Sequence, residues 1–207
     1  MTFILTILAI GTLLVVNELF WRKHAKHGEF SRKFIHITVG SFVAFWPFFL
    51  SWVQIGVLSI AFLLVVAVSK YFKLFKAIHS VQRPTYGEVF FALAVGLIAI
   101  VTHDKYIYAV ALLQMSLADG MAAVMGTKFG KSQRYYVFGQ AKSVAGSLTF
   151  FVVSVVLLAG YDMLATPIGF GLLLVTALSA TFIENIGVQG MDNILVPLLV
   201  AGLLVLN

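Results

Sequence analysis

The run TFILTILAIGTLLVVNELF occupies residues 2–20, and Glu18 is its one charged residue. A helix needs about 20 predominantly apolar residues to cross the hydrocarbon core of a bilayer. Arg22, Lys23 and Lys26 follow the run, and no basic residue precedes it. A cleaved secretory signal has the opposite order of charge and a small-residue cleavage site, so we interpret this run as a retained first transmembrane helix.

The composition of the remaining chain extends this interpretation. Of the 207 residues, 61% are hydrophobic and 11% are charged, against about 25% charged in soluble domains. The apolar runs are continuous rather than alternating, which favours helices over a barrel. We therefore predict one integral membrane domain over residues 1–207. The chain has no cysteine, which excludes disulfides, thiolate catalysis and cysteine metal sites.

Further apolar runs recur along the chain. We predict an all-α, polytopic integral membrane bundle of about eight transmembrane helices, with counts of seven and nine left open. The predicted ranges are 2–21, 34–50, 52–69, 87–102, 106–126, 144–161, 163–184 and 191–206.

The basic residues alternate between the predicted loops. All fourteen Lys and Arg residues except Lys105 lie in the first, third and fifth loops. The positive-inside rule then places these loops in the cytoplasm and both termini on the other, non-cytoplasmic side. The net charge of +6 is explained by this orientation and by contact with anionic lipid headgroups, so we expect no nucleic-acid partner.

The acidic residues gather at the predicted cytoplasmic face as well. Only Asp104 and Asp162 lie on the far side. A path for ions would spread such groups through the depth of the bilayer, whereas a pocket open to the cytosol would gather them at one end. The gathered acidic residues are Glu18, Glu29, Glu88, Asp119, Glu184 and Asp192, and His36 lies at the same face.

Asp119 is the most unusual of these residues, because it lies inside an apolar run. An ionisable residue at such a place is costly and usually functional. One interpretation is a packing role, with the carboxylate paired with a lysine or bound by Ser116 or Gln114. The other is a magnesium ligand, since Mg²⁺ prefers one or two carboxylates together with substrate phosphate oxygens.

Small and basic residues follow Asp119. Ala122, Gly126 and Gly130 recur at four-residue spacing, which is typical of closely packed membrane helices and also lets a phosphate approach the backbone. Lys131 follows in the basic loop and is a candidate ligand for the phosphates of a nucleotide. Further on, a basic residue and a hydroxyl at the start of a helix form a ready anion site. That second group consists of Lys142, Ser143 and Gly146.

Two other places have candidate site residues. Arg32 and Lys33 lie where the second predicted span begins, just before residue 34, and are either interfacial anchors or phosphate ligands. His36 and Glu88 are alternative proton acceptors, while Glu88 is equally explained by the positive end of a helix. Two polar pairs face each other across the last predicted loop, Glu184-Asn185 and Asp192-Asn193. They are either helix caps or one edge of a metal or nucleotide site.

These motifs together resemble those of the CTP-dependent lipid kinases, which include phytol kinase, dolichol kinase and the CTP-dependent diacylglycerol kinase. The first motif is Glu29-x-x-Arg32-Lys33-x-x-His36-x-x-x-Gly40, and the second is Asp119-x-x-Ala122-x-x-x-Gly126-x-x-x-Gly130. Ala141-Lys142-Ser143-Val144-Ala145-Gly146 is similar to the second half of their CTP-binding motif. Asp192-Asn193, followed by Pro197, is similar to their closing segment. A more distant resemblance links the chain to phosphatidate cytidylyltransferase.

The resemblance implies a kinase that transfers the γ-phosphoryl group of CTP to the hydroxyl of an isoprenoid alcohol, entering sideways from the cytoplasmic leaflet. It implies Mg²⁺ held by Asp119 and Asp192, with Glu184 or Asn193. A cytidylyltransferase, a diacylglycerol kinase and an ion or lipid transporter are the alternatives. The expected location is the inner membrane in a bacterium, or the endoplasmic reticulum or a plastid membrane in a eukaryote.

Overall fold

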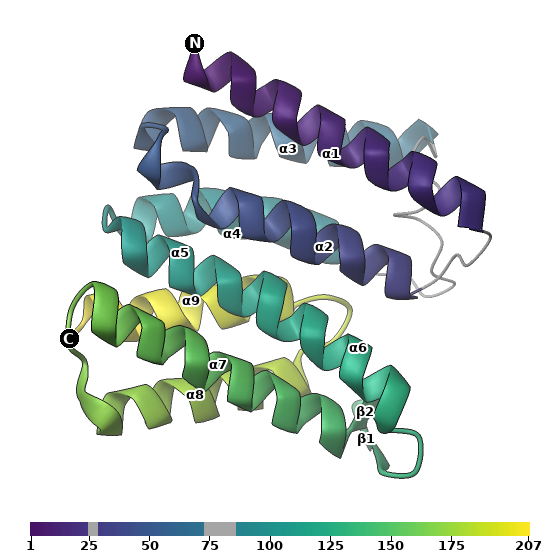
Figure 1. Cartoon of the computed structure of the whole chain (residues 1–207), viewed down its shortest axis with the longest axis vertical. Coiled ribbons are helices and arrows are strands. Elements are labelled where there is room, and N and C mark those ends of the chain that lie inside the picture. Colours follow the sequence, from purple (N-terminus) through teal and green to yellow (C-terminus); the bar gives the residue numbers. More distant parts are fainter. Residues whose placement is uncertain (25–28, 73–85) are drawn as a thin grey trace.

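A computed structural model describes residues 1–24, 29–72 and 86–207 of the chain, and it is predominantly helical (Figure 1). Every predicted range coincides mainly with helix, so the all-helical prediction is confirmed. The elements are α1 (Thr2–His24), α2 (Glu29–Ala44), η1 (Trp46–Phe48), α3 (Trp52–Phe72), α4 (Gly87–Val101), α5 (Lys105–Leu113), η2 (Gln114–Ala118), α6 (Asp119–Phe129), β1 (Arg134–Val137), β2 (Gln140–Ser143), α7 (Val144–Leu164), α8 (Gly169–Ile186) and α9 (Asp192–Val205).

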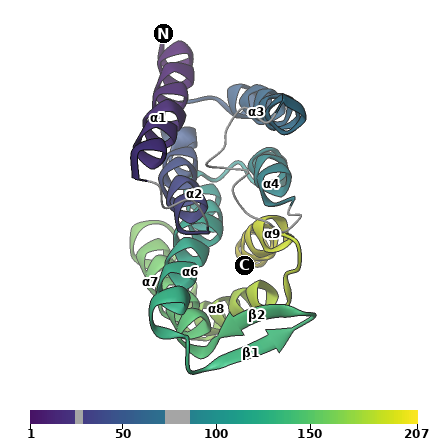
Figure 2. The ribbon, with the colours of Figure 1, turned by 90° about the vertical axis from the view of Figure 1, so that its right-hand side faces the viewer.

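The helices form two rows, seen end-on in Figure 2. One row contains α1, α2, the α5–η2–α6 helix and α7, and the other contains α3, α4, α9 and α8. Consecutive helices run in opposite directions (Figure 1). As a result, both chain termini lie at one end of the bundle. The starts of α2 and α7 and the end of α6 lie at the opposite end.

Five described helices are long and apolar enough to cross a membrane. The longest is the continuous segment Lys105–Phe129, made of α5, η2 and α6, and it is 72% buried within the bundle. The helices α4 and α9 are apolar but shorter, and α2 has only 16 residues and begins with charged side chains. The structure therefore supports a membrane bundle with five candidate spans, and the count of eight stays a prediction.

Small residues set how closely α2 approaches the longest helix. A Cβ atom added to Gly40 would overlap the Ser116 side chain, and one added to Gly120 would overlap Ile37. Because the two glycines lack a Cβ, the backbones approach closely. This contact places the start of α2 beside the start of α6.

Two features of the fold differ from the prediction. The boundary between the sixth and seventh predicted ranges lies later in the chain than predicted, because α7 continues to Leu164 and α8 begins at Gly169. Between the two helices, Asp162 Oδ1 accepts hydrogen bonds from the N–H groups of Ile168 and Gly169. The fifth loop is also not irregular. Its strands β1 and β2 pair as a two-residue hairpin, in which Phe138 and Gly139 both have positive φ, as a type I′ turn requires.

Candidate active site

A polar cavity of about 490 Å³ lies at the end of the bundle opposite the termini. Its walls come from α2, α6, the hairpin, α7, the end of α8 and the start of α9. Segments far apart in the sequence therefore meet here. The predicted site residues that line it are Arg32, Lys33, Asp119, Gly126, Lys142, Ser143, Gly146, Glu184, Asp192 and Asn193.

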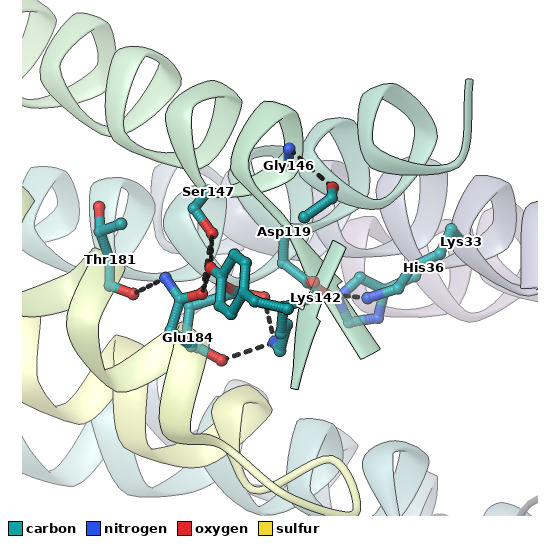
Figure 3. A network of polar contacts seen from close by, with 11 residues as sticks. Lys33, His36, Asp119, Lys142, Gly146, Ser147, Thr181 and Glu184 are labelled. Atoms are coloured by element: carbon teal, nitrogen blue, oxygen red, sulfur yellow. Dashed lines mark hydrogen bonds and ion pairs between the residues drawn. The ribbon is translucent and has the colours of Figure 1, made fainter. Parts of the chain in front are cut away.

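Asp119 lies in the wall of this cavity and is 5% exposed. Its Oδ2 atom accepts a hydrogen bond from the buried ammonium of Lys33 (Figure 3). The structure therefore shows the first interpretation of Asp119, a carboxylate paired with a lysine. The lysine is Lys33, which was predicted to bind phosphate. Metal binding by Asp119 remains a prediction, since both roles use the same carboxylate oxygens.

The backbone before Asp119 is wound as a π-helix, and this has a direct effect on His36. The Asp119 N–H donates to the carbonyls of Gln114 and Ser116 instead of that of Met115, its partner in a regular α-helix. The Met115 carbonyl accepts from His36 Nε2 at 3.0 Å instead. Turns of π-helix often occur at functional sites.

Lys142 and Glu184 form a second ion pair across the cavity, from β2 to the end of α8 (Figure 3). The Lys142 ammonium lies 2.5 Å from Glu184 Oε1 and donates to the Glu184 backbone carbonyl at 2.7 Å. Burial lowers the pKa of Lys142, but the Glu184 carboxylate outweighs burial and holds that pKa above the ordinary lysine value. Lys142 is therefore a permanent cation in the cavity at neutral pH.

The Asp192 carboxylate completes the charge pattern. It is repelled by Asp119 and Glu184 and attracted by Lys33 and Lys142. Three acidic groups therefore share one cavity with two lysines. Among the described residues no three His, Asp or Glu side chains form a ready metal-binding group. Carboxylate and amide oxygens are nevertheless the ligands that Mg²⁺ prefers, and it takes only one or two from the protein beside substrate phosphates, so this donor set fits the ion.

Ser143 caps α7 and packs against the glycines. Its hydroxyl oxygen accepts from the Gly146 N–H at 3.1 Å. A Cβ atom on Gly130 would overlap the Ser143 side chain, and one on Gly126 would come within 2.8 Å of Ser143 Oγ. Gly126 therefore serves close packing as well as lining the cavity, while Gly130 lies behind the wall. The structure leaves the predicted nucleotide ligand Lys131 exposed and outside the cavity.

Tyr135, which was not among the predicted site residues, belongs to a hydrogen-bonded group beside Lys142 that also contains Ser147 and the predicted residue Asn185. The Tyr135 hydroxyl contacts Ser147 Oγ at 2.5 Å and donates to Asn185 Oδ1. Ser147 Oγ donates to the same Asn185 oxygen at 2.8 Å, and Asn185 Nδ2 is bound to the Thr181 carbonyl. The pattern Arg134-Tyr135-Tyr136-Val137 before Phe138-Gly139 was the available signal, because aromatic and β-branched residues favour strands.

His36 and Glu88 do not line the polar cavity but a second, smaller one. This cavity of about 70 Å³ is bounded mainly by apolar side chains of α1, α2, α3 and α4. Arg32 and Asn193 line both cavities. Asn193 is fixed there by a 2.9 Å hydrogen bond from Nδ2 to the Gly87 carbonyl. Polar and apolar cavities therefore meet at these two side chains.

Two curated proteins resemble the chain over most of its length. A phytol kinase of Synechocystis sp. is 33% identical over 199 residues, which are 91% of this chain and 84% of the relative. A probable chloroplastic phytol kinase 2 of Glycine max is 27% identical over 216 residues, which are 95% of this chain and 71% of the relative. No protein-family model and no solved structure matches the chain. The 33% identity over 91% of this chain and 84% of the Synechocystis relative shows that the chain belongs to the phytol kinase family.

Proposed function

We propose that this protein is a membrane kinase that transfers the γ-phosphoryl group of CTP to the hydroxyl of an isoprenoid alcohol at the cytoplasmic leaflet. The observation that carries the proposal is the meeting of a charged cavity and an apolar cavity at Arg32 and Asn193. A kinase for a lipid alcohol needs both environments side by side. The names of the two relatives support an isoprenoid alcohol as the acceptor.

The polar cavity has the properties of a nucleotide site. Its volume of about 490 Å³ lies within the range of about 300–1,000 Å³ that is common for small-molecule pockets. The start of α7 borders the cavity at Gly146 and Ser147, where the helix dipole favours an anion. Arg32, Lys142 and Arg134 add positive charge to the same cavity. These groups would hold the phosphates of CTP.

Mg²⁺ would be held by Asp119 and Asp192, with Asn193 or Glu184 assisting. When bound, the ion would neutralise charge on the transferred phosphoryl group. Lys33 pairs with Asp119 and would be close enough to shift to a phosphate oxygen as the carboxylate turns to the ion. Catalysis of phosphoryl transfer consists mainly of such positioning and charge neutralisation.

The acceptor side of the reaction uses the apolar cavity. The alcohol oxygen forms a bond to the γ-phosphorus, the bond from that phosphorus to the β–γ bridging oxygen breaks, and CDP leaves. The hydroxyl proton passes to His36 or Glu88, the two titratable side chains that line the apolar cavity beside Arg32. The hydrogen bond from His36 Nε2 to Met115 leaves Nδ1 of a neutral imidazole as the proton acceptor.

Labelled CTP tests the proposal directly. Purified protein in lipid nanodiscs receives Mg²⁺, a prenol and CTP labelled in either the γ or the α phosphate. We expect label in the lipid from the γ position alone, and the Asp119→Asn protein should give none. Label from the α position would show nucleotidyl transfer instead. Transfer from ATP in preference to CTP would refute the choice of donor, and no transfer from any nucleotide would refute the kinase.

The sidedness of the site has its own test. Both termini lie at the end opposite the polar cavity (Figure 1), and the alternation of basic loops supports a cytoplasmic position for that cavity. A reporter fused to Asn207 should therefore be active only on the non-cytoplasmic side. A cytoplasmic reporter would contradict the proposed orientation and the count of eight spans.

A further inference from the structure

We propose that the apolar cavity binds only the hydroxyl-bearing isoprene unit of the acceptor and that the rest of the chain lies outside it, along α1 and α3 in the lipid. The inference rests on the proposed function and deepens it. It predicts that the enzyme selects its acceptor by the branching of the first unit rather than by the length of the tail.

The position of the cavity supports an acceptor site. It meets the polar cavity at Arg32 and Asn193, where a hydroxyl would lie nearest to the phosphates. From Arg32 it follows α2 inward as far as Val39, seven residues later, or about 10 Å at 1.5 Å per residue. An alcohol bound here would place its polar end at Arg32 and its apolar end in the bundle.

Aromatic side chains give the cavity a fixed shape. Phe91 is 4% exposed and packs edge-to-face against His36, at 5.3 Å between ring centroids. Its other neighbour is Phe62, with the ring centroids 5.6 Å apart. Such perpendicular pairs are energetically favoured and hold each ring in place. A wall of three fixed rings is suited to a rigid, branched hydrocarbon rather than to a flexible straight chain.

The volume of the cavity limits what enters it. A cavity needs about 10–15 Å³ of space open to a water-sized sphere for each water-sized group that it holds. The cavity volume of about 70 Å³ therefore holds roughly five such groups, the size of one isoprene unit. A complete tail of several units does not fit.

The remainder of the tail has a route into the bilayer. The helices α1 and α3 are the last helices of their rows in Figure 2, and each contributes to the cavity wall, through Leu14 and through Phe62 and Val66. Only 17% of the α1 span and 28% of the α3 span is buried, against 72% for the central helix. A tail between α1 and α3 would therefore meet lipid-exposed surfaces.

Acceptor pairs test the selectivity. We expect 3-methyldodecan-1-ol to exceed dodecan-1-ol in kcat/KM by about tenfold or more, the range expected for one methyl group in a fitted pocket. Farnesol and geranylgeraniol, which share the first unit and differ in tail length, should differ by less than about threefold. Equal use of the straight and branched alcohols, or a steep dependence on tail length, would overturn the inference.

Substitutions in α3 test the location. Val66→Trp fills the cavity, and we expect the KM for the prenol to rise about tenfold while the KM for CTP stays unchanged. Val68→Trp is the matched control, because Val68 lies two residues away on the exposed surface of the same helix. Phe62→Ala enlarges the cavity and should admit a larger substituent at carbon 3 of the alcohol. A Val66→Trp protein with unchanged kinetics would contradict the location.

Photo-crosslinking gives an answer that does not depend on turnover. A prenol with a diazirine in its first unit should label Phe62, Val66 or Phe91, and one with a diazirine at the tail end should label the outer faces of α1 and α3. Labelling of other helices by the first probe would refute the site. A wild-type protein that binds the probe here but transfers no phosphate would refute the proposed function and leave the cavity assignment supported.

Discussion

His36 Nε2 donates to the backbone carbonyl of Met115 at 3.0 Å, a contact that joins α2 to the π-helical turn before Asp119. In a regular α-helix that carbonyl would be occupied by the Asp119 N–H. The irregular turn thus provides the acceptor that orients His36, and the same turn ends at the carboxylate of the proposed metal site.

Replacing His36 separates its structural role from its chemical one. His36→Phe leaves the Met115 carbonyl without a donor, and we expect a loss of about 1–3 kcal/mol in the free energy of unfolding. His36→Gln keeps a donor and should recover much of that stability. If His36 also accepts the proton, both variants lose turnover. Full activity in the glutamine variant would leave Glu88 as the proton acceptor.

The Lys33–Asp119 pair makes a prediction about compensation. Lys33→Met leaves a buried carboxylate without its cation, and we expect a cost of about 3–5 kcal/mol in unfolding experiments. The Lys33→Met/Asp119→Asn protein should regain most of the stability and remain inactive. If the double variant is no more stable than the single one, the pair is not the source of the loss.

Added Mg²⁺ should stabilise the wild type, Lys33→Met and Asp119→Asn proteins to different extents. In the Lys33→Met protein the Asp119 carboxylate is no longer paired, so added Mg²⁺ should raise the thermal unfolding midpoint more than in the wild type, and EDTA should reverse the rise. Asp119→Asn is the control that should not respond. An equal response of all three proteins would exclude Asp119 as a ligand.

The Lys142–Glu184 pair predicts a dependence on alkaline pH. The folded-state pKa of Lys142 is raised, so its ion pair contributes stability fully below the unfolded value of about 10.4 and loses it as the pH rises through the folded value. Wild type should therefore exceed Lys142→Met in thermal stability at neutral pH. The difference should shrink above about pH 10.4. A difference that stays constant across this range would contradict an ionic contribution.

The packing of Gly130 on Ser143 is testable by one methyl group. Gly130→Ala would push the Ser143 cap away from α7, and we expect a cost of about 1–3 kcal/mol, the range for overpacking. Ser143→Gly should relieve only part of the clash in a double variant, because the added Cβ also lies 2.5 Å from the Gly126 backbone oxygen. Gly160→Ala is the control on α7, because no atom lies within 4 Å of its added Cβ. It should be neutral or stabilising.

The helices and most of the residues that line the polar cavity could be predicted, because both depend on patterns along the chain. Apolar length identifies a membrane helix wherever it occurs, and the motif residues meet because consecutive helices alternate in direction. The partner of Asp119 could not be chosen, since Lys33 lies 86 positions away and several lysines were available. The turn of π-helix from Gln114 to Ala118 was also invisible, because a shift in hydrogen bonding leaves no mark in composition.

In the part of the chain that the structure describes, the polar cavity lies at one end of the bundle. This position matters more for the product than for the substrate. A prenol has a small neutral head, whereas its phosphate is doubly charged and cannot cross hydrocarbon without a large desolvation cost. Phosphorylation at this end would trap the lipid in one leaflet. The enzyme would thus give each molecule a fixed side of the membrane, and any enzyme that consumes the product must work from that same side.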